Sequence, residues 1–329
     1  MPSTIRRASL RSLAKINLDL RVLHKNTNGF HEMRTVFHTI SLADLLEVEY
    51  EPSKRTEIRI EDSADIPDNL VVRAARSVLD ALRLPARVQF RLTKRIPMGG
   101  GLGGGSSNAA TVLLALPVLA GRVLRMETLL ELAAGLGSDV PFFLLGGAGV
   151  GLGRGTEIYP LADLAEELLL LVAPNLHVAT GPAYQALQRG SNPGEWSKSI
   201  RGFQAVVSAL EQKRTATSVS ALSVNDFEVS VFQQHPRLRK IRANLSALSA
   251  GARMSGSGST IFGLFRTLEE RGCAEKAVVD DRLFRDCSLI RAALVRRKHY
   301  QNLWRRQLKE HLAAEDTSWP PRSRHAKDR

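Results

Sequence analysis

Apolar and polar residues alternate along the first part of the chain. Every second residue from Ile16 to Val22 is apolar, and polar or charged residues stand between them. A period of two is typical of a β-strand with one buried face. We expect the other face of this strand to present Lys15 and Asn17 side by side. The same alternation over residues 88–92 predicts a second strand.

A helical period marks several later segments. Residues 69–84 place apolar side chains along one face, which predicts an amphipathic helix. Apolar spacing and turn residues predict further helices over residues 127–136, 139–145, 200–214 and 236–249. The apolar run 168–173 predicts a buried strand, and another strand is expected over 259–265.

The domain organisation follows from the length of the chain and from where these patterns change. A chain of 329 residues is long for one compact core, so two domains are expected. We expect the domain boundary near residues 160–174, where the sequence pattern changes. This boundary gives an N-terminal domain at 1–165 and a C-terminal domain at 166–297. Clear periodicity is lost after about residue 298, which predicts a disordered, basic tail over 298–329.

The formal net charge of +13 raises the question of nucleic-acid binding. Residues 285–329 contain 12 Lys/Arg and 5 Asp/Glu, a net of +7, which leaves +6 for the other 284 residues. A solvated basic tail accounts for that concentration. Aromatic residues are only 5% of the chain and are scattered, whereas nucleic-acid surfaces interleave them with basic residues. The composition therefore argues against nucleic acid and suits small anionic ligands.

No segment suggests a membrane or secretory role. The apolar run 168–173 is far shorter than the roughly 20 residues that a bilayer requires. Arg11 and Lys15 interrupt any apolar signal core near the N-terminus, so a cytoplasmic location is expected. Cys273 and Cys287 match neither zinc nor redox spacing, and we expect both to be reduced and structural.

The most informative segment is glycine-rich. Six of the seven residues from Gly99 to Gly105 are Gly, between a predicted strand and a predicted helix that starts at about Ser106. Glycine lets backbone N–H groups converge, and a helix N-terminus adds free N–H groups and a positive dipole end. Such an arrangement predicts a phosphate-binding loop rather than a mere turn.

Three common phosphate loops do not fit this segment. A P-loop ends in Gly-Lys-Ser/Thr, and no Lys follows these glycines. Gly99, Gly101 and Gly104 match G-x-G-x-x-G, but the region 122–127 that should hold the acidic strand end reads as loop and helix. The VAIK, HRD and DFG segments of protein kinases are absent from the sequence.

Two further residues suggest the chemistry of a phosphoryl transfer to a hydroxyl group. Asp139 lies at a turn-to-helix junction and could accept the hydroxyl proton, while Lys15 could stabilise the charge on the reacting oxygens. Simpler interpretations stand beside these roles. Taken alone, Asp139 is typical of a helix N-cap, Lys15 of a solvated strand residue, and His31 of a turn residue.

The segment PMGGGLGGGSSNAA at residues 97–110 resembles the phosphate loop of the GHMP superfamily, named for galactokinase, homoserine kinase, mevalonate kinase and phosphomevalonate kinase. AKINL at 14–18, GFH at 29–31, LGSDVPFFL at 136–144, NDFE at 225–228 and GARMSGSG at 251–258 are similar to segments of one branch of it. These blocks occur in the family's order over about residues 8–295.

The resemblance implies an α+β, two-domain architecture. The N-terminal α/β domain would carry the Gly-rich loop, the C-terminal domain would be a ferredoxin-like α/β sandwich, and the active site would lie between them. The implied activity is ATP-dependent phosphorylation of the 2-hydroxyl of 4-diphosphocytidyl-2-C-methyl-D-erythritol, in non-mevalonate isoprenoid biosynthesis. Magnesium would accompany ATP, held mostly by phosphates and water, and no protein ligand for it is identified. Neither a monomer nor a dimer is favoured.

Site residues are implied by the same resemblance. Lys15 and Asp139 match the catalytic pair. Asn17, Phe30, His31, Thr180 and Tyr184 match substrate positions, with Phe30 and Tyr184 enclosing the cytosine and His31 reading its edge. The ATP positions are Asn69, Lys94, Pro97, Met98, Gly99, Gly100, Gly101, Leu102, Gly103, Gly104, Gly105, Ser106, Ser107 and Asn108, with Asn69 and Lys94 near the adenine and ribose.

Some segments depart from the family pattern, and other functions compete with it. Position 30 is often Tyr in the family, residues 117–125 differ from it, and residues 180–184 fit it loosely. Another GHMP kinase, acting on homoserine, mevalonate or a sugar, is the nearest alternative, and Gly29-Phe30-His31 argues against it. A nucleic-acid-binding protein that uses the tail and a catalytically silent nucleotide-binding regulator are the other two.

Overall fold

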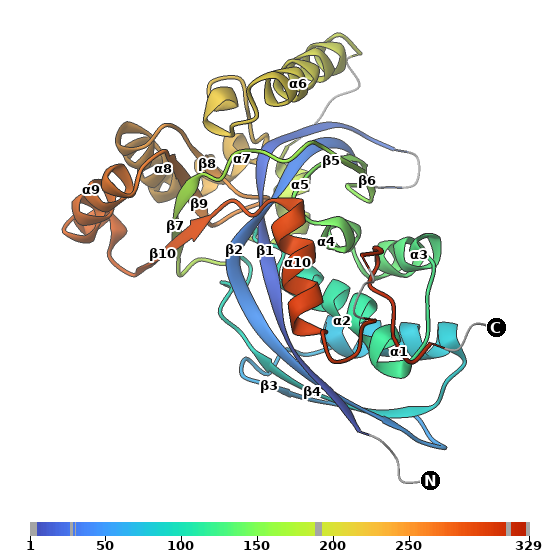
Figure 1. Ribbon diagram of the computed structural model, residues 1–329. Helices are drawn as coiled ribbons and strands as arrows, with labels where there is room; N and C mark the ends of the chain where they lie inside the picture. Colours follow the sequence, from blue (N-terminus) through green and yellow to red (C-terminus); the bar gives the residue numbers. More distant parts are fainter. Residues whose placement is uncertain (1–4, 27–28, 30, 188–192, 314–316, 327–329) are drawn as a thin grey trace.

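The computed structural model describes residues 5–26, 29, 31–187, 193–313 and 317–326 (Figure 1). Its strands are β1 (Arg6–Lys25), β2 (His31–Pro52), β3 (Glu57–Asp62), β4 (Ala86–Thr93), β5 (Ala148–Gly153), β6 (Glu157–Pro160), β7 (Leu168–Pro174), β8 (Ala252–Met254), β9 (Ile261–Phe265) and β10 (Cys287–Ala293). Its helices are α1 (Leu70–Leu82), α2 (Gly104–Ala120), α3 (Met126–Leu136), α4 (Val140–Leu145), α5 (Thr180–Ala186), α6 (Pro193–Lys213), α7 (Phe227–Gln234), α8 (Pro236–Leu248), α9 (Leu268–Val279) and α10 (Arg297–Gln307), with short 3₁₀ turns at Thr217–Val219 and Arg282–Phe284.

A six-stranded sheet forms the first layer, and β2 is its central strand. One edge of β2 pairs with β1, and the other edge pairs with β5 near its start and with β4 near its end. Only β3 and β4 run parallel within the described sheet. Helix α2 packs on β1 and β2, and α1, α3 and α4 surround it. The Gly-rich segment thus leads into a helix held firmly against the sheet.

The second layer is a four-stranded antiparallel sheet in the order β10-β7-β9-β8. The chain passes from β7 through helices to the β8–β9 hairpin, and then through α9 to β10. This β-α-β-β-α-β order is that of a ferredoxin-like fold, as expected from the sequence. Helices α8 and α9 pack against the sheet and bury its apolar side chains (Figure 1).

Strand β1 joins the two layers. It is 20 residues long, and it contributes Leu10, Ile16 and Leu20 to three successive apolar clusters. The alternation predicted for this strand is present, but the prediction of one exposed face is wrong. Lys15 and Asn17 are 3% and 1% exposed. Segments distant along the chain cover the polar face, including Gly103, Asp139 and Gly256 around Lys15, and no local pattern in the sequence predicts this cover.

Buried charges on this strand are satisfied by partners from distant segments. The Arg21 Nε donates to Asp19 Oδ2 at 2.8 Å, and the Val224 amide donates to Asp19 Oδ1 at 2.7 Å. Burial raises the pKa of Asp19, while the bonds from Arg21 and Val224 oppose that shift. The Arg21 guanidinium also donates to the Leu222 carbonyl at 3.2 Å. These contacts fix residues 222–226 against β1 and so bring the second layer over it.

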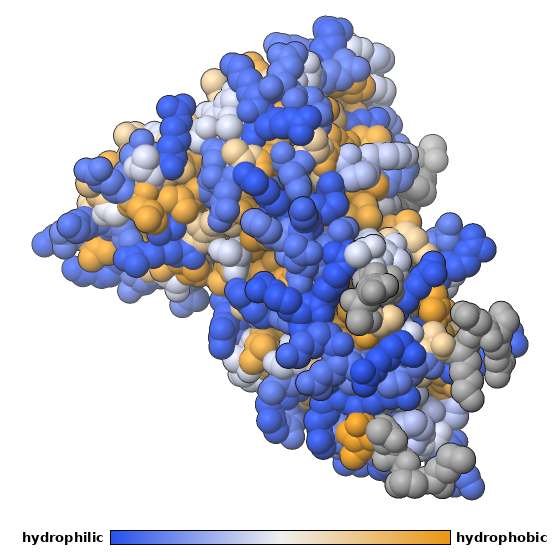
Figure 2. Space-filling model, in the orientation of Figure 1, coloured by the Kyte–Doolittle hydropathy of each residue, from blue (hydrophilic) through white to orange (hydrophobic). Residues whose placement is uncertain are grey.

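The C-terminal segment is ordered where it is described, and the prediction of a disordered tail over 298–329 is wrong for those residues. Helix α10 returns from β10 to the first layer, and Tyr300, Trp304, Leu308 and Leu312 enter its apolar core. These residues recur every four positions, a helical period that the intervening basic residues obscure in the sequence. The surface over α10 is largely hydrophilic, because the aromatic side chains of this helix, Tyr300 and Trp304, are buried (Figures 1 and 2).

No helix in the described ranges is long and apolar enough to cross a membrane. Cys273 is exposed and Cys287 half-buried, and both are free thiols, which agrees with the expectation from their spacing. The predicted domain limits at 165 and 297 stay predictions, although the return of α10 assigns the end of the chain to the core of the first layer.

The burial of Trp304 predicts that the C-terminal segment stabilises the fold. Replacing Trp304 by Ala should lower the free energy of unfolding by about 3–5 kcal/mol, because a large side chain that is 1% exposed leaves a cavity. Arg306→Ala, on the exposed side of the same helix, is the matched control and should change it by less than about 0.5 kcal/mol. Urea denaturation of both variants makes the measurement. Equal stabilities would contradict the assigned packing.

His38 predicts a loss of stability in mild acid. Its ring is fully buried on β2, with Nδ1 2.8 Å from the Thr39 carbonyl, and burial lowers its pKa to about 4 from about 6.5 in the unfolded chain. Below about pH 6.5 the unfolded chain binds a proton at this residue and the folded chain does not. The free energy of unfolding should therefore be unaffected by His38 above pH 6.5 and fall by about 3 kcal/mol between pH 6.5 and 4. Denaturation curves across this range should show a steeper loss for wild type than for His38→Gln. Parallel curves would rule His38 out as the cause.

Candidate active site

A cavity of about 310 Å³ lies between the two layers, and its lining comes from both. The residues that line it are Lys15, Asn17, Leu20, Met33, Gly99, Gly101, Gly103, Ser106, Ser138, Asp139, Arg154, His177, Val178, Thr180, Tyr184, Phe227, Gly256 and Ser257. Both predicted catalytic residues and part of the predicted phosphate loop are among them. Asp139 is the only Asp or Glu in this lining, and Lys15, Arg154 and His177 are its basic side chains.

Lys15 and Asp139 form an ion pair at the wall of this cavity. The Lys15 Nζ lies 3.2 Å from Asp139 Oδ2, and it donates to Asn17 Oδ1 at 2.7 Å. Asn17 in turn donates to Thr35 Oγ1 at 2.8 Å, so its amide is oriented with the oxygen toward the lysine. The Lys15 side chain is 3% exposed and that of Asp139 is 32% exposed. The lysine is therefore held rigidly, and the carboxylate remains open to the cavity.

The simpler interpretations of the two residues do not hold in the structure. Asp139 occupies the N-cap position of α4, but its side chain makes no capping hydrogen bond. Lys15 is buried rather than solvated, with its Nζ 5.4 Å from the centre of the Phe37 ring. A buried ammonium needs partners of opposite charge or strong acceptors. Asp139 and Asn17 meet that need, so the pair belongs to the site and not to the helix end.

Two glycine turns meet backbone to backbone beside this pair. A Cβ on Gly101 would lie 2.0 Å from the Ser255 carbonyl oxygen, and one on Gly256 would lie 3.2 Å from Gly101 Cα. Ser255 Oγ donates to the Gly101 carbonyl at 2.9 Å. Only glycine allows so close an approach, and Gly101 also has φ +74°. The contact couples the loop before α2 to the turn before β9.

The loop itself has the form predicted for phosphate binding. Helix α2 starts at Gly104, two residues before the expected Ser106, and Gly103 is its N-cap. Ser106 is half-buried and lines the cavity, whereas the Ser107 hydroxyl is turned away and donates to the Leu13 carbonyl at 2.6 Å. Met98 is 60% exposed. The free N–H groups of the first turn of α2 and the Ser106 hydroxyl could hold anionic oxygens.

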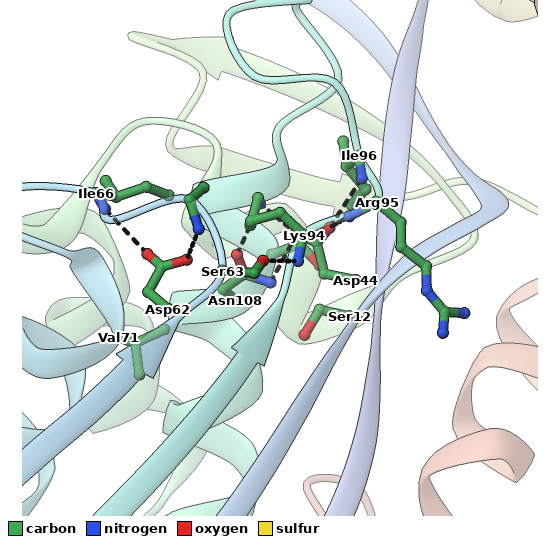
Figure 3. A network of polar contacts seen from close by, with 12 residues as sticks. Ser12, Asp44, Asp62, Ser63, Ile66, Val71, Lys94, Arg95, Ile96 and Asn108 are labelled. Atoms are coloured by element: carbon green, nitrogen blue, oxygen red, sulfur yellow. Dashed lines mark hydrogen bonds and ion pairs between the residues drawn. The ribbon is translucent and has the colours of Figure 1, made fainter.

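Lys94 and Asn108, two of the predicted ATP residues, join a polar network with Asp44 next to the loop (Figure 3). They and Asn69 are not among the residues that line the cavity. Lys94 Nζ pairs with Asp44 Oδ2 and donates to Asn108 Oδ1 at 3.1 Å, and Asn108 Nδ2 donates to Asp44 Oδ2 at 3.1 Å. Asn69 caps α1 through the Val71 amide, and its Nδ2 donates to Asp62. Asp44 Oδ1 also accepts hydrogen bonds from the Arg95 and Ile96 amides, so the network of Lys94, Asn108 and Asp44 fixes the chain just before the loop. Contacts of Asn69 and Lys94 with adenine or ribose remain a prediction.

Tyr184 and Phe227 form an aromatic part of the cavity wall, and the predicted His31 does not line the cavity but stacks on Tyr184. The His31 and Tyr184 rings stack with centroids 4.9 Å apart, and the Phe227 ring meets Tyr184 edge-on at 4.7 Å. Burial lowers the pKa of His31, with a smaller effect from Lys25, which favours its neutral form. Burial, with a smaller effect from Asp139, raises the pKa of Tyr184 to about 12. The predicted Phe30 lies outside the described residues.

The structure adds lining residues that the sequence did not indicate. Arg154 and His177 bring positive or polar character to the cavity, and a Cβ on Gly99 would lie 2.1 Å from His177 Nδ1. Thr180 and Ser257, which approach from different segments, pair through their hydroxyls at 3.1 Å. Thr180 was predicted and Ser257 was not. Nothing in the local sequence marks Arg154 or His177, since neither belongs to a motif or a periodic face.

Comparison with known proteins places these features in a family. Residues 69–147 match the GHMP kinases N terminal domain, and residues 206–279 match the GHMP kinases C terminal domain. A relative from Solibacter usitatus, a 4-diphosphocytidyl-2-C-methyl-D-erythritol kinase, is 50% identical over 324 residues, which is 98% of this chain and 99% of the relative.

Solved structures give the same result at the level of the fold. A crystal structure of a 4-(cytidine 5'-diphospho)-2C-methyl-D-erythritol kinase superposes with a TM-score of 0.69 at 34% identity, over 87% of this chain and 98% of the other. A homoserine kinase from Cytophaga hutchinsonii gives a TM-score of 0.66 at 18% identity, over 88% of this chain and 94% of the other, a likeness of fold alone.

Proposed function

The chain belongs to the 4-diphosphocytidyl-2-C-methyl-D-erythritol kinases of the GHMP kinase family, and we propose that Lys15 and Asp139 carry out its phosphoryl transfer. The enzyme transfers a phosphoryl group from ATP to the 2-hydroxyl of that alcohol, a step in non-mevalonate isoprenoid biosynthesis. The observation that carries the residue assignment is the Lys15–Asp139 pair beside the two glycine turns.

Asp139 is the proposed general base. Its carboxylate faces the cavity and makes no capping bond, so an oxygen is available to the acceptor hydroxyl. As the oxygen attacks the γ-phosphorus, the hydroxyl proton passes to Asp139, and the bond between the γ-phosphorus and the β–γ bridging oxygen breaks to give ADP.

Lys15 is the proposed electrostatic partner. An ammonium group has three hydrogens, and the contacts with Asp139 and Asn17 account for two. The third can point toward the glycine turns, since a Cβ on Gly256 would lie 3.5 Å from Nζ. A phosphoryl oxygen placed there would receive a charge-assisted hydrogen bond in a poorly solvated site, where such a bond is strong. Asn17 would keep the ammonium aimed correctly.

The loop over residues 97–105 and the first turn of α2 would hold the ATP phosphates through backbone N–H groups. Mg²⁺ bound with the nucleotide would neutralise phosphate charge. The described residues contain no group of three metal-ligating side chains, so phosphate and water oxygens would hold the ion, with the Ser106 hydroxyl as the contributing protein group. Oligomeric state and cytoplasmic location stay predictions.

The aromatic part of the cavity wall would receive the cytosine. Tyr184 offers an apolar ring that is fixed by Phe227, and neutral His31 can pair with an amino donor beside a ring nitrogen. His31 covers one face of Tyr184 in this structure, with the ring centroids 4.9 Å apart. A base between these rings would need roughly twice the stacking distance of about 3.5 Å, so we propose that His31 turns away from Tyr184 as the base binds.

The base assignment is tested with Asp139→Asn. The amide keeps the size of the side chain but cannot accept the proton, so kcat should fall by about 10²–10⁴-fold. Binding of ATP, measured by calorimetry, should stay within about threefold of wild type, because the phosphate loop is untouched. A kcat within about threefold of wild type would refute Asp139 as the base.

Selectivity for cytosine is tested with His31 and Tyr184. Stacking on an aromatic ring contributes about 1–3 kcal/mol, so Tyr184→Leu should raise the KM for the cytidyl substrate by about 10–100-fold with a smaller change in kcat. Tyr184→Phe, which keeps the ring, is the matched control. His31→Ala should narrow the preference for cytidyl over uridyl analogues in steady-state kinetics. Undiminished discrimination by that variant would limit His31 to a role in the turn.

A further inference from the structure

The C-terminal segment contacts the helix that carries Asp139. Three carbonyls at the far end of α4 and at its C-cap accept hydrogen bonds from this segment. The Phe143 carbonyl accepts from the Tyr300 hydroxyl, the Leu144 carbonyl from Trp319 Nε1 at 2.8 Å, and the Gly146 carbonyl from Arg297 Nε at 3.2 Å. The last carbonyls of a helix have no partner within the helix. The Gly146 amide satisfies the Phe142 carbonyl, and the C-terminal segment supplies donors to the next two carbonyls of α4.

The C-terminal segment also packs closely against the end of α4. A Cβ on Gly146 would lie 2.3 Å from Tyr300 Cδ1, and one on Gly147 would lie 2.7 Å from Arg297 Cβ. Tyr300 packs edge-on with Trp319, with the ring centroids 6.2 Å apart. Both glycines thus leave room for side chains of α10, and residues 146 and 147 cannot shift toward α10 without collision.

Helix α4 has little to hold it in place by itself. It contains six residues, well below the length at which an isolated helix is stable. The side chain of its N-cap residue, Asp139, makes no capping bond and pairs with Lys15 instead. On the site side, the Phe143 ring lies against Gly103, where an added Cβ would come within 2.9 Å of it. The position of α4 is therefore set by its neighbours: its buried side chains pack against α2 and α3, the loop lies on the site side, and the C-terminal segment holds the far end.

We propose that Tyr300 and Trp319, with Arg297, are positioning residues for the phosphoryl transfer, acting through α4 on Asp139. The inference rests on the proposed role of Asp139 as the base. None of the three lines the cavity, so none would touch substrate or ATP. They hold the carbonyl end of a six-residue helix, and through it they fix the Asp139 carboxylate 3.2 Å from Lys15. The C-terminal segment is then a component of the active-site framework as well as of the core.

The experiment compares variants that differ in their contact with α4. Tyr300→Phe removes one hydroxyl and keeps the ring, and Trp319→Phe removes the indole N–H. Trp304→Phe is the matched control, because Trp304 belongs to the same aromatic cluster and no hydrogen bond from it to α4 is found among the described residues. These three variants and the double variant Tyr300→Phe/Trp319→Phe are made in the full-length enzyme, and their melting temperatures, kcat, and KM for both substrates are measured.

Two readouts separate positioning from a general loss of stability. Small displacements of a catalytic group can lower a rate by up to about 10²-fold, so kcat should fall by about tenfold in Tyr300→Phe and further in the double variant, with both KM values within about twofold of wild type. Hydrogen exchange of the Gly146 amide, which donates to the Phe142 carbonyl at 3.0 Å, should become faster in these variants. Trp304→Phe should lower the melting temperature without either effect.

The outcomes are distinguishable. If Tyr300→Phe and the double variant keep kcat within twofold of wild type while Asp139→Asn loses it, the positioning role fails and the base assignment stands. If Asp139→Asn itself keeps its rate, the proposed chemistry fails first. A double variant that does not fold leaves Tyr300→Phe to decide, since it removes a single oxygen atom. A fall in kcat that Trp304→Phe shares in proportion to its loss of stability would also overturn the proposal.

Discussion

The close approach of two glycine turns is the constraint on which the rest of this structure depends. The turn before α2 and the turn before β9 meet at Gly101 and Gly256, where any side chain would collide with backbone. The Thr260 amide also donates to the Gly100 carbonyl at 3.3 Å. This contact joins the two sheets at one point and encloses Lys15 between them. The glycine loop before α2 is thereby supported by the turn before β9, at the wall of the cavity.

Burying Lys15 at that point imposes electrostatic conditions on its surroundings. An ammonium group removed from water must find acceptors, and the structure provides Asp139 and Asn17, with Thr35 orienting the latter. Deeper along the same strand, Asp19 and Arg21 satisfy each other and the backbone of residues 222–224. The polar face of β1 thus serves as the interface between the layers, and its Lys15 and Asn17 line the cavity together with Asp139.

The C-terminal segment supports the site from outside the cavity. It buries three aromatic side chains and two leucines against the first layer, and it supplies hydrogen bonds to carbonyls of a helix too short to hold its own position. The Lys94–Asp44–Asn108 network does the equivalent for the phosphate loop. In both cases, polar side chains that do not line the cavity hold the elements that do. This role explains why several polar groups near the site are buried.

The sequence by itself determined the local features, which are the glycine loop and the helices near 70–82, 126–136 and 236–248. Through family resemblance it also predicted the ferredoxin-like second layer and the Lys15–Asp139 pair. Local spacing carries this information because helix, strand and turn preferences depend on near neighbours. Only the tertiary structure decided that both faces of β1 are buried, that Arg154 and His177 join the cavity, and that α10 docks beside α4. Those outcomes depend on segments far apart in the chain, and the basic residues around Trp304 hid its apolar period from any local pattern.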